Sequence, residues 1–284
     1  MIIVTGTKRA GTSLWMQILG AAGFPVVGEA FPGVWEASIR EANPRGFFES
    51  AYRQGIYYRT NPDPETGRFF HPREVKGHAV KIFVPGLVRT DLAYIGPVVG
   101  TMRSWREYTP SLKRLFQLED RWRAEAVARG EAPPVGTFPT EETLNRVRAG
   151  QTPAALEWFF DNYDLIRDAL TRKYPFHMTT YDRLLADPQG EIAQVLRWLG
   201  QGDEAAAVAA VDPTLRTQAG GGEVDETVAD VAGIFDELYH SVNVEKTLTR
   251  GFIEELNRTN RLLSDRWKEI VEARRKASFT PPAC

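Results

Sequence analysis

"MIIVTGTKRAGTSLWMQILGAAG" (residues 1–23) joins a short apolar run to an apolar helical pattern through a loop with two glycines. Residues 1–5 are typical of a buried strand, and the apolar residues of 12–23 recur at helical spacing. The loop, "GTKRAG" at 6–11, has the spacing Gly-x-x-x-x-Gly. Such a loop before a helix N-terminus binds anions, because its backbone N–H groups and the helix dipole converge. The stretch predicts either a phosphate-binding loop or a plain strand-to-helix turn.

The residues inside this loop differ from those of a nucleotide-hydrolysing P-loop. Thr12 occupies the position of the usual lysine, whereas Ser13 stands where a magnesium ligand is expected. Two cations, Lys8 and Arg9, lie within the loop instead. The glycine spacing alone is weak evidence, since it recurs from Gly23 and from Gly28. The strand and helix around 6–11 are what favour a phosphate ligand there.

Composition limits the class of protein. The 284 residues are 43% hydrophobic and 25% charged, with a net charge of −2, as in ordinary globular proteins. We expect one domain over residues 1–284, with a helical C-terminal part from about 230. Nothing in the overall charge suggests nucleic acid as a partner, and no apolar stretch suggests stable membrane insertion. The lone cysteine, Cys284, fits a reducing compartment, so we expect a cytoplasmic protein of open oligomeric state.

Strand patterns alternate with helix patterns along the chain. Strands are predicted within 78–84, 94–103 and 176–185. Helices are predicted for 106–130 with Pro110 near the start, 152–174 with Thr152 as N-cap, 187–200 ending at Gly200, and 245–276. This alternation predicts an α/β fold with a mainly parallel sheet flanked by helices. Two stretches rich in glycine and proline, 55–78 and 212–229, are predicted to be functional lids or partly disordered loops.

Three further segments give the sequence a family resemblance. In "TMRSWREYTPSLKRLF" (101–116), Arg103 and Ser111 stand eight residues apart. "YDRLLADPQGEIAQVLRWLG" (181–200) and "NPRGFFES" (43–50) follow the same family's patterns, the second in its bacterial members. With the first loop, they resemble the sulfotransferases that use 3′-phosphoadenosine-5′-phosphosulfate, over roughly residues 2–200. The resemblance implies a P-loop-NTPase-like sulfotransferase fold.

The resemblance also implies a donor site that needs no metal. The first loop would hold the 5′-phosphosulfate, with Arg9 beside the leaving oxygen. Arg103 and Ser111 would hold the 3′-phosphate, which remains on the product, adenosine 3′,5′-bisphosphate. The family's C-terminal Arg-Lys-Gly clamp is missing, and Arg216 is a candidate substitute. The other expected donor-binding residues are Lys8, Ala10, Gly11, Thr12, Ser13 and Tyr181.

Each of these residues also has a purely structural interpretation. Lys8 is either a second cation for the donor or a solvated surface lysine. Arg103 could form a surface salt bridge, and Ser111 could cap a helix. Tyr181 either borders the adenine or is a half-buried core tyrosine.

The acceptor side departs from the family's small-molecule members. Those enzymes have Lys-Thr-His-Leu-Pro after the second strand, with the histidine as general base. This chain has Lys81-Ile82-Phe83-Val84-Pro85, and Phe83 cannot accept a proton. Lys81 matches the family, and either faces the transferring sulfuryl group or is structural.

Other branches of the family use a glutamate after the first helix as the base. Glu29, in "VVGEAF", is the first candidate by its position, although in tyrosylprotein members the base corresponds to the next residue, here Ala30. Glu49 and Glu36 are the rivals. His71 and His78, in the 55–78 stretch, are further candidates. The base would take a proton from a hydroxyl or amine of the acceptor.

We therefore expect an enzyme that transfers a sulfuryl group to a small-molecule acceptor. Aromatic residues in "FFES", "IYY" and "RFFHP" favour an apolar or aromatic acceptor, or else belong to the core. One alternative is a nucleoside-triphosphate-dependent kinase or GTPase on the same fold. Thr12 argues against it, because it occupies the position of the usual P-loop lysine. Another is a non-catalytic nucleotide-binding relative.

Overall fold

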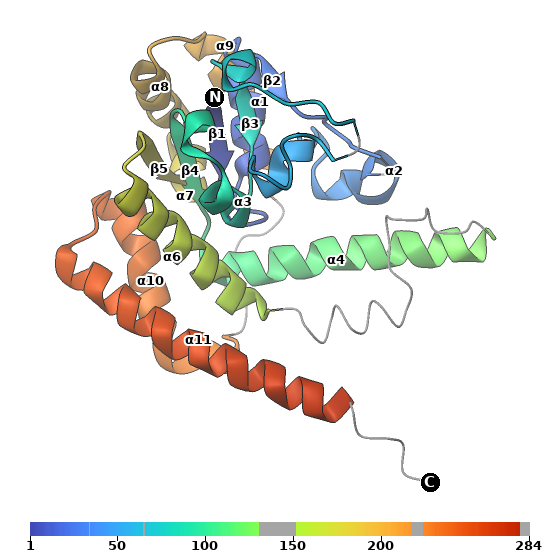
Figure 1. Ribbon diagram of the computed structural model, residues 1–284, viewed down its shortest axis with the longest axis vertical. Helices are drawn as coiled ribbons and strands as arrows, with labels where there is room; N and C mark the ends of the chain where they lie inside the picture. The colour runs from blue at the N-terminus through green and yellow to red at the C-terminus, as the bar shows by residue number, and fades with distance from the viewer. Residues whose placement is uncertain (34, 65, 131–151, 217–223, 279–284) are drawn as a thin grey trace.

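A parallel sheet forms the centre of the structure, a computed structural model that describes residues 1–33, 35–64, 66–130, 152–216 and 224–278 (Figure 1). Within these ranges the sheet has five strands, in the order β2-β3-β1-β4-β5, and every neighbouring pair is parallel. The strands are β1 (Ile2–Thr5), β2 (Val26–Val27), β3 (Ala79–Lys81), β4 (Val98–Met102) and β5 (Phe176–Thr180). The predicted α/β fold with a mainly parallel sheet is confirmed.

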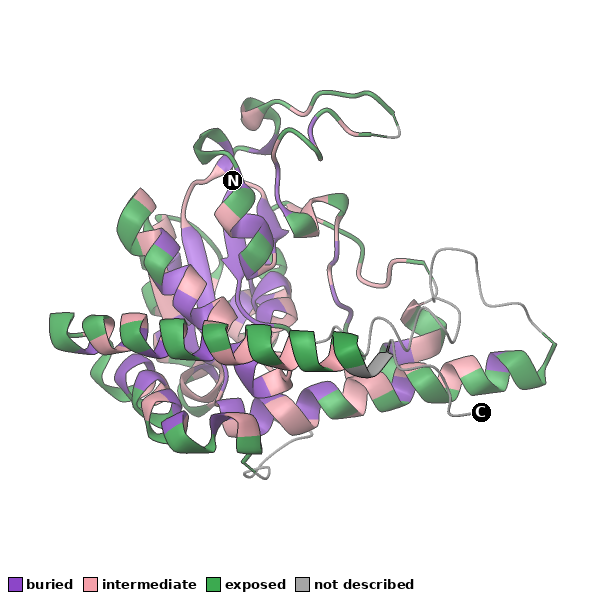
Figure 2. Ribbon diagram, turned by 60° about the horizontal axis from the view of Figure 1, so that its bottom comes forward, coloured by how far each residue is buried: buried purple, intermediate pink, exposed green. Residues whose placement is uncertain are grey.

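Helices cover both faces of this sheet. Alternate side chains of β1 enter different cores, because successive residues of a strand point to opposite faces. Ile2 and Val4 pack with helices α1 (Thr12–Ala21), α8 (Pro188–Leu199) and α9 (Glu204–Ala209). Ile3 packs on the other side with α3 (Val84–Arg89) and α6 (Ala154–Arg172). Figure 2 accordingly shows the strands as largely buried, although the outer strand β5 is only partly so.

A third core joins four helices beside the sheet. α4 (Trp105–Ala128), α6, α10 (Ala232–His240) and α11 (Arg250–Ser278) contribute its buried residues, with Trp158 and Phe235 at the centre. α4 and α11 extend well past the sheet in Figure 1. α11 lies within the helical C-terminal part that the sequence predicts. No described helix has both the length and the apolar composition needed to span a membrane.

Two predicted helix starts are wrong. α4 begins at Trp105 rather than near Pro110, which lies inside the helix. The proline removes one backbone hydrogen bond, but Trp105 and Tyr108 on the same helix are almost fully buried and keep it in place. The N-cap of α6 is Pro153 rather than Thr152, and it provides no side-chain cap. The predicted end of α8 at Gly200 is confirmed by its left-handed conformation there.

The structure describes nearly all of the irregular stretch 55–78 but only part of the stretch 212–229. In 55–78, the Asn61 side chain donates to the Phe70 carbonyl and accepts from the Phe70 N–H, at 2.9 and 2.8 Å. These bonds close the stretch upon itself and against Tyr94, to which Asn61 also donates at 2.6 Å. In 212–229, residues 217–223 lie outside the described residues. Short 3₁₀ turns, Pro213–Leu215 and Glu226–Val231, flank them.

Candidate functional site

The loop between β1 and α1 is tightly built against its neighbours. A side chain at Gly6 would place its Cβ 2.3 Å from the Thr101 carbonyl oxygen, so only glycine fits there. Gly11 is left-handed, with φ of 99°, and forms the N-cap of α1. A Cβ at this position would lie 2.9 Å from the Tyr181 ring. The two glycines of the motif therefore allow the loop to pass close to β4 and to the end of β5.

Three backbone N–H groups where this loop joins α1 are unpaired within the described residues, whereas the Ala10 N–H donates to the Thr7 carbonyl at 3.2 Å. The N–H groups of Gly11, Thr12 and Ser13 have no backbone or side-chain acceptor among the described residues. Such unpaired donors at the first turn of a helix attract anions, and the helix dipole adds to the attraction. Within the described part of the chain, the first turn of α1 therefore has the unpaired donors that a phosphate-binding loop requires.

Arg9, Arg103 and Ser111 meet beside this loop. Arg9 Nε donates to Ser111 Oγ at 3.2 Å, and Arg103 Nη1 lies 3.4 Å from the same oxygen. Arg9 Nη2 also donates to the Ala42 carbonyl at 3.0 Å. Burial and the charge of Arg103 lower the pKa of Arg9 to about 10, so the guanidinium keeps its charge at neutral pH. The structure brings together a cation of the loop and the Arg-Ser pair of α4.

Glu107 links Arg103 to Arg216. Arg103 Nε and Nη2 both donate to Glu107 Oε2 at 3.0 Å, and Arg216 Nη2 donates to Glu107 Oε1 at 2.5 Å. Tyr181 lies against both cations, with its ring centroid 4.9 Å from the Arg103 guanidinium and 5.9 Å from that of Arg216. Arg216 also pairs with Asp182 at 2.9 Å. Glu107 was missed in the sequence, although its position four residues after Arg103 on a helix is a signal of pairing.

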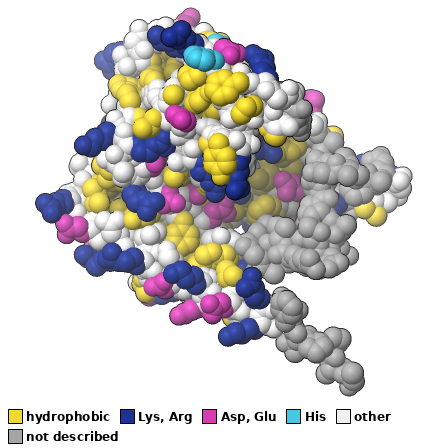
Figure 3. All heavy atoms as spheres, in the orientation of Figure 1, with side chains coloured by type: hydrophobic (Ala, Val, Ile, Leu, Met, Phe, Trp, Pro, Cys, Tyr) yellow, Lys and Arg dark blue, Asp and Glu magenta, His cyan; other side chains and the backbone are white. Residues whose placement is uncertain are grey.

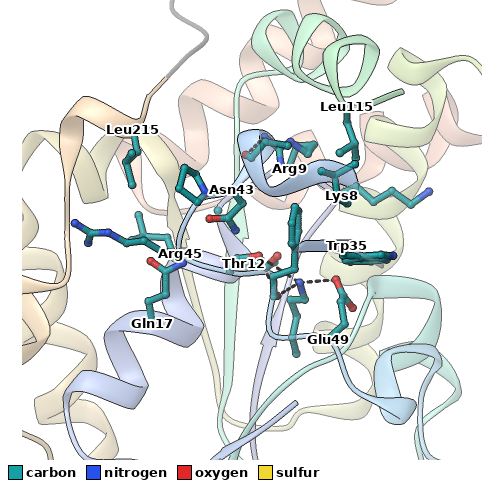
Figure 4. A pocket seen from close by; sticks show the side chains of 18 of the residues that line it. Lys8, Arg9, Thr12, Gln17, Trp35, Asn43, Arg45, Glu49, Leu115 and Leu215 are labelled. Atoms are coloured by element: carbon teal, nitrogen blue, oxygen red, sulfur yellow. Dashed lines mark hydrogen bonds and ion pairs between the residues drawn. The ribbon is translucent and has the colours of Figure 1, made fainter. Parts of the chain in front are cut away.

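A cavity of about 380 Å³ runs along the loop. Figure 4 shows Leu215, Arg45 and Gln17 toward one end, and Trp35, Leu115 and Glu49 toward the other, with Thr12 between. After the roles that the family resemblance implies, we name the first the donor end and the second the acceptor end. On the face seen in Figure 3, the surface is hollowed near α2 (Trp35–Ile39) and α4, with hydrophobic side chains in the hollow. Its size is typical of small-molecule sites.

A buried ion pair lies at the acceptor end. Lys81 Nζ lies 2.6 Å from Glu49 Oε1, and both side chains are at most 4% exposed. Lys81 also donates to Ser13 Oγ at 3.3 Å and to the Phe47 carbonyl. Glu49 Oε2 has no hydrogen-bond partner among the described residues. Burial lowers the pKa of Lys81, while Glu49 opposes the shift. One carboxylate oxygen of this ion pair is thus buried without a hydrogen-bond partner in the described part of the chain.

The structure separates the predicted candidates for the base. Glu29 and Glu49 pair through their backbones, N to O at 2.8 and 3.0 Å, but Glu29 is exposed and does not line the cavity. Glu36 pairs on the surface with Arg40 at 2.9 Å. His71 caps a 3₁₀ turn and His78 lies outside the cavity lining. The preference for Glu29 therefore does not fit the geometry, whereas Glu49 does.

The remaining predicted residues lie around the same loop. Ala10 and Thr12 are buried, and Ser13 donates to the Phe47 carbonyl at 3.1 Å. Lys8 is 47% exposed and pairs with Glu157 at 3.1 Å, so its charge is partly compensated. Phe83 lines the acceptor end.

No family model matches the chain, and no curated protein is significantly similar to it.

Proposed function

We propose that the protein is a sulfotransferase that uses 3′-phosphoadenosine-5′-phosphosulfate as donor and a small hydroxylated molecule as acceptor. The observation that carries this proposal is the meeting of Arg9, Arg103 and Ser111 within 3.4 Å at one cavity. These residues come from two segments that the family resemblance links to the two phosphates of this donor. Tyr181, from a third segment, lies against the same arginine.

The residues around the first turn of α1 and the start of α4 suit a ligand with two separate anionic groups. The unpaired N–H groups of Gly11, Thr12 and Ser13 would bind the group at the first turn of α1. Arg103 and Ser111 would bind a second phosphate on the α4 side. When bound, the donor supplies an activated sulfuryl group on its 5′-phosphate. Arg9 remains charged beside the loop, and a preorganised cation there stabilises negative charge on the departing oxygen.

Glu49 is the proposed general base. Lys81 holds Oε1, which leaves Oε2 to accept the proton of the acceptor hydroxyl. Lys81 also contacts Ser13, so it connects the base to the first turn of α1 at 3.3 Å. This arrangement replaces the histidine that the family has at the position of Phe83.

Ligand-dependent thermal stability tests the proposal directly. Adenosine 3′,5′-bisphosphate without added metal should raise the melting temperature, because a ligand that binds only the native state stabilises it. ATP or GTP with magnesium should raise it much less, since neither carries a 3′-phosphate. Arg103→Ala should abolish most of the bisphosphate effect. Arg106→Ala is the matched control, because Arg106 pairs with Asp236 at 2.6 Å outside the cavity lining.

Two outcomes would reject this function. Stabilisation by a triphosphate with magnesium, and none by the bisphosphate, would favour a kinase or GTPase. Equal loss of the bisphosphate effect in Arg103→Ala and Arg106→Ala would show that Arg103 does not read the 3′-phosphate. Direct assay of labelled sulfuryl transfer then separates an enzyme from a non-catalytic binding protein.

A further inference from the structure

Arg53 is a charged residue of the cavity that the proposed chemistry does not use. It belongs to the 3₁₀ turn Ala51–Gln54, and its carbonyl accepts from the Phe83 N–H at 3.0 Å. Its side chain lines the cavity at the acceptor end with Phe83, Lys81 and Glu49. Its charge contributes to the lowered pKa of Lys81, which is consistent with a position close to the buried ion pair.

No carboxylate of the described protein compensates this guanidinium. The lining of the cavity has three carboxylates, Glu49, Glu119 and Asp212. Glu49 pairs with Lys81, and Asp212 pairs with Arg45 at 3.0 Å toward the donor end. Within the described residues, the Arg53 side chain has neither an ion pair nor a hydrogen bond to any of the three. A half-buried arginine without a partner is costly unless a ligand supplies the anion.

The rest of the acceptor end is largely apolar. Its walls include the side chains of Trp35, Ile39, Phe47, Phe83, Leu115 and Phe116. Glu119 is the carboxyl group of the α4 wall, and burial raises its pKa. An anionic group would be repelled by Glu119 and attracted by Arg53, so the two side chains would set the orientation of an acceptor.

From this arrangement we propose that the acceptor is an apolar or aromatic hydroxy compound with a carboxylate, and that Arg53 binds this carboxylate. The proposal rests on the sulfotransferase function. Arg53 is then a specificity-determining residue, because a guanidinium binds a carboxylate with two parallel hydrogen bonds. The hydroxyl at the other end of the acceptor would face Glu49.

The bonds, electrons and proton of the transfer step are all accounted for by the acceptor, the donor and Glu49. The acceptor oxygen forms a bond to sulfur, and the bond between sulfur and the 5′-phosphate oxygen breaks. Its electron pair leaves with the phosphate. The acceptor's proton goes to Glu49 Oε2. Arg53 takes no part in these changes, because it holds the far end of the acceptor.

A matched pair of acceptors tests this assignment. Sulfuryl transfer to 4-hydroxyphenylacetate is compared with transfer to 4-hydroxyphenylacetamide, which has the same shape and no charge. We expect kcat/KM to favour the acid by roughly 10- to 100-fold, as for a charge-assisted hydrogen-bonded pair. Arg53→Met should remove this preference with little effect on the amide, and Arg53→Lys should restore part of it. Arg59→Met is the control, since Arg59 is an exposed arginine outside the cavity lining.

Several results would overturn the role of Arg53. One is equal use of acid and amide by the wild type. Another is an equal loss for both acceptors in Arg53→Met, which would assign Arg53 to the sulfuryl group or to structure. A third is a preference for the acid that falls as much in Arg59→Met as in Arg53→Met. The preference would then come from the general surface charge and not from Arg53.

Binding separates failure of this inference from failure of the function. Thermal shifts with acid and amide are measured with and without adenosine 3′,5′-bisphosphate. If the bisphosphate binds but the acid has no advantage that depends on Arg53, the carboxylate site is rejected and the donor site stands. If the bisphosphate does not bind, the sulfotransferase function is rejected, and acid binding that depends on Arg53 would still support an anion site there.

Discussion

Two buried glutamates, Glu49 in the cavity lining and Glu107 behind Arg103, differ in how completely they are paired. Glu107 accepts from Arg103 with one carboxylate oxygen and from Arg216 with the other. Glu49 uses only Oε1, toward Lys81, and its Oε2 has no partner among the described residues. Both are at most 7% exposed. Burial alone therefore does not distinguish a structural carboxylate from a reactive one.

The number of carboxylate oxygens with a hydrogen-bond partner distinguishes a structural carboxylate from a reactive one. A buried carboxylate with both oxygens paired orients its cations and stabilises the fold. A buried carboxylate with one unpaired oxygen is costly, and such an oxygen is available to a ligand or a proton. Glu107 is accordingly a positioning residue for two arginines, whereas Glu49 is the candidate for proton transfer.

The largest effect is expected for Glu49→Gln. The amide keeps the shape but cannot accept the proton, so turnover should fall by about 10²- to 10⁴-fold. The shift in melting temperature caused by adenosine 3′,5′-bisphosphate should be retained, because Glu49 lies at the acceptor end. Reaction rates at saturating donor and acceptor measure the loss of turnover, and thermal unfolding with and without the bisphosphate measures the shift.

Glu29→Gln is the control for the same measurement. Glu29 is exposed and outside the cavity lining, so turnover should change little. If Glu29→Gln is inactive and Glu49→Gln is active, the unpaired oxygen of Glu49 is not the proton acceptor.

An intermediate effect is expected for Glu107→Gln, and on stability rather than on chemistry. The change leaves the buried Arg103 without its negative partner, so the ligand-free protein should lose up to about 3 kcal/mol of unfolding free energy. The bisphosphate should then stabilise the variant more than the wild type, because a bound phosphate compensates the arginines. Denaturant unfolding with and without ligand measures both. A large loss of turnover at full saturation, with stability unchanged, would reverse the roles of the two glutamates.

The smallest effect is expected at Asp161, a half-buried carboxylate of α6 outside the cavity lining. Burial and the nearby Glu157 raise its pKa to about 7. Because the folded protein binds this proton more tightly than the unfolded chain, its contribution is fully present at low pH and is lost as pH rises through about 7.

Asp161→Asn should therefore be more stable than the wild type at about pH 8, by about 1–2 kcal/mol after allowance for solvent screening. The two proteins should differ little near pH 4, and turnover should not change. Unfolding by denaturant across this pH range measures the difference. A variant that is less stable than the wild type at the higher pH would show that Asp161 is paired in its ionised form.

Local patterns were sufficient to predict the α/β class and four of the five described strands, but not β2 (Val26–Val27) or the order of the strands. β1, the glycine loop and α1 are contiguous, so their residues determine one another's positions through backbone geometry alone. Arg103 and Ser111 are separated by only eight residues, and the helix that begins between them at Trp105 brings their side chains together at 3.4 Å. Pro110 misled the prediction of that start, because tertiary burial of Trp105 outweighs one lost hydrogen bond.

Only the tertiary structure determines which glutamate lies at the acceptor end. Glu29 and Glu49 both lie in short extended segments with no periodicity, and a carboxylate in such a segment is expected on the surface. The difference comes from Lys81 on β3, which is 32 residues from Glu49 in sequence and 2.6 Å from it in space. The links of Arg216 to Glu107 and of Arg53 to Phe83 are equally long-range. Strand order and side-chain burial create these contacts, because pairing between distant charges depends on which elements the fold places side by side.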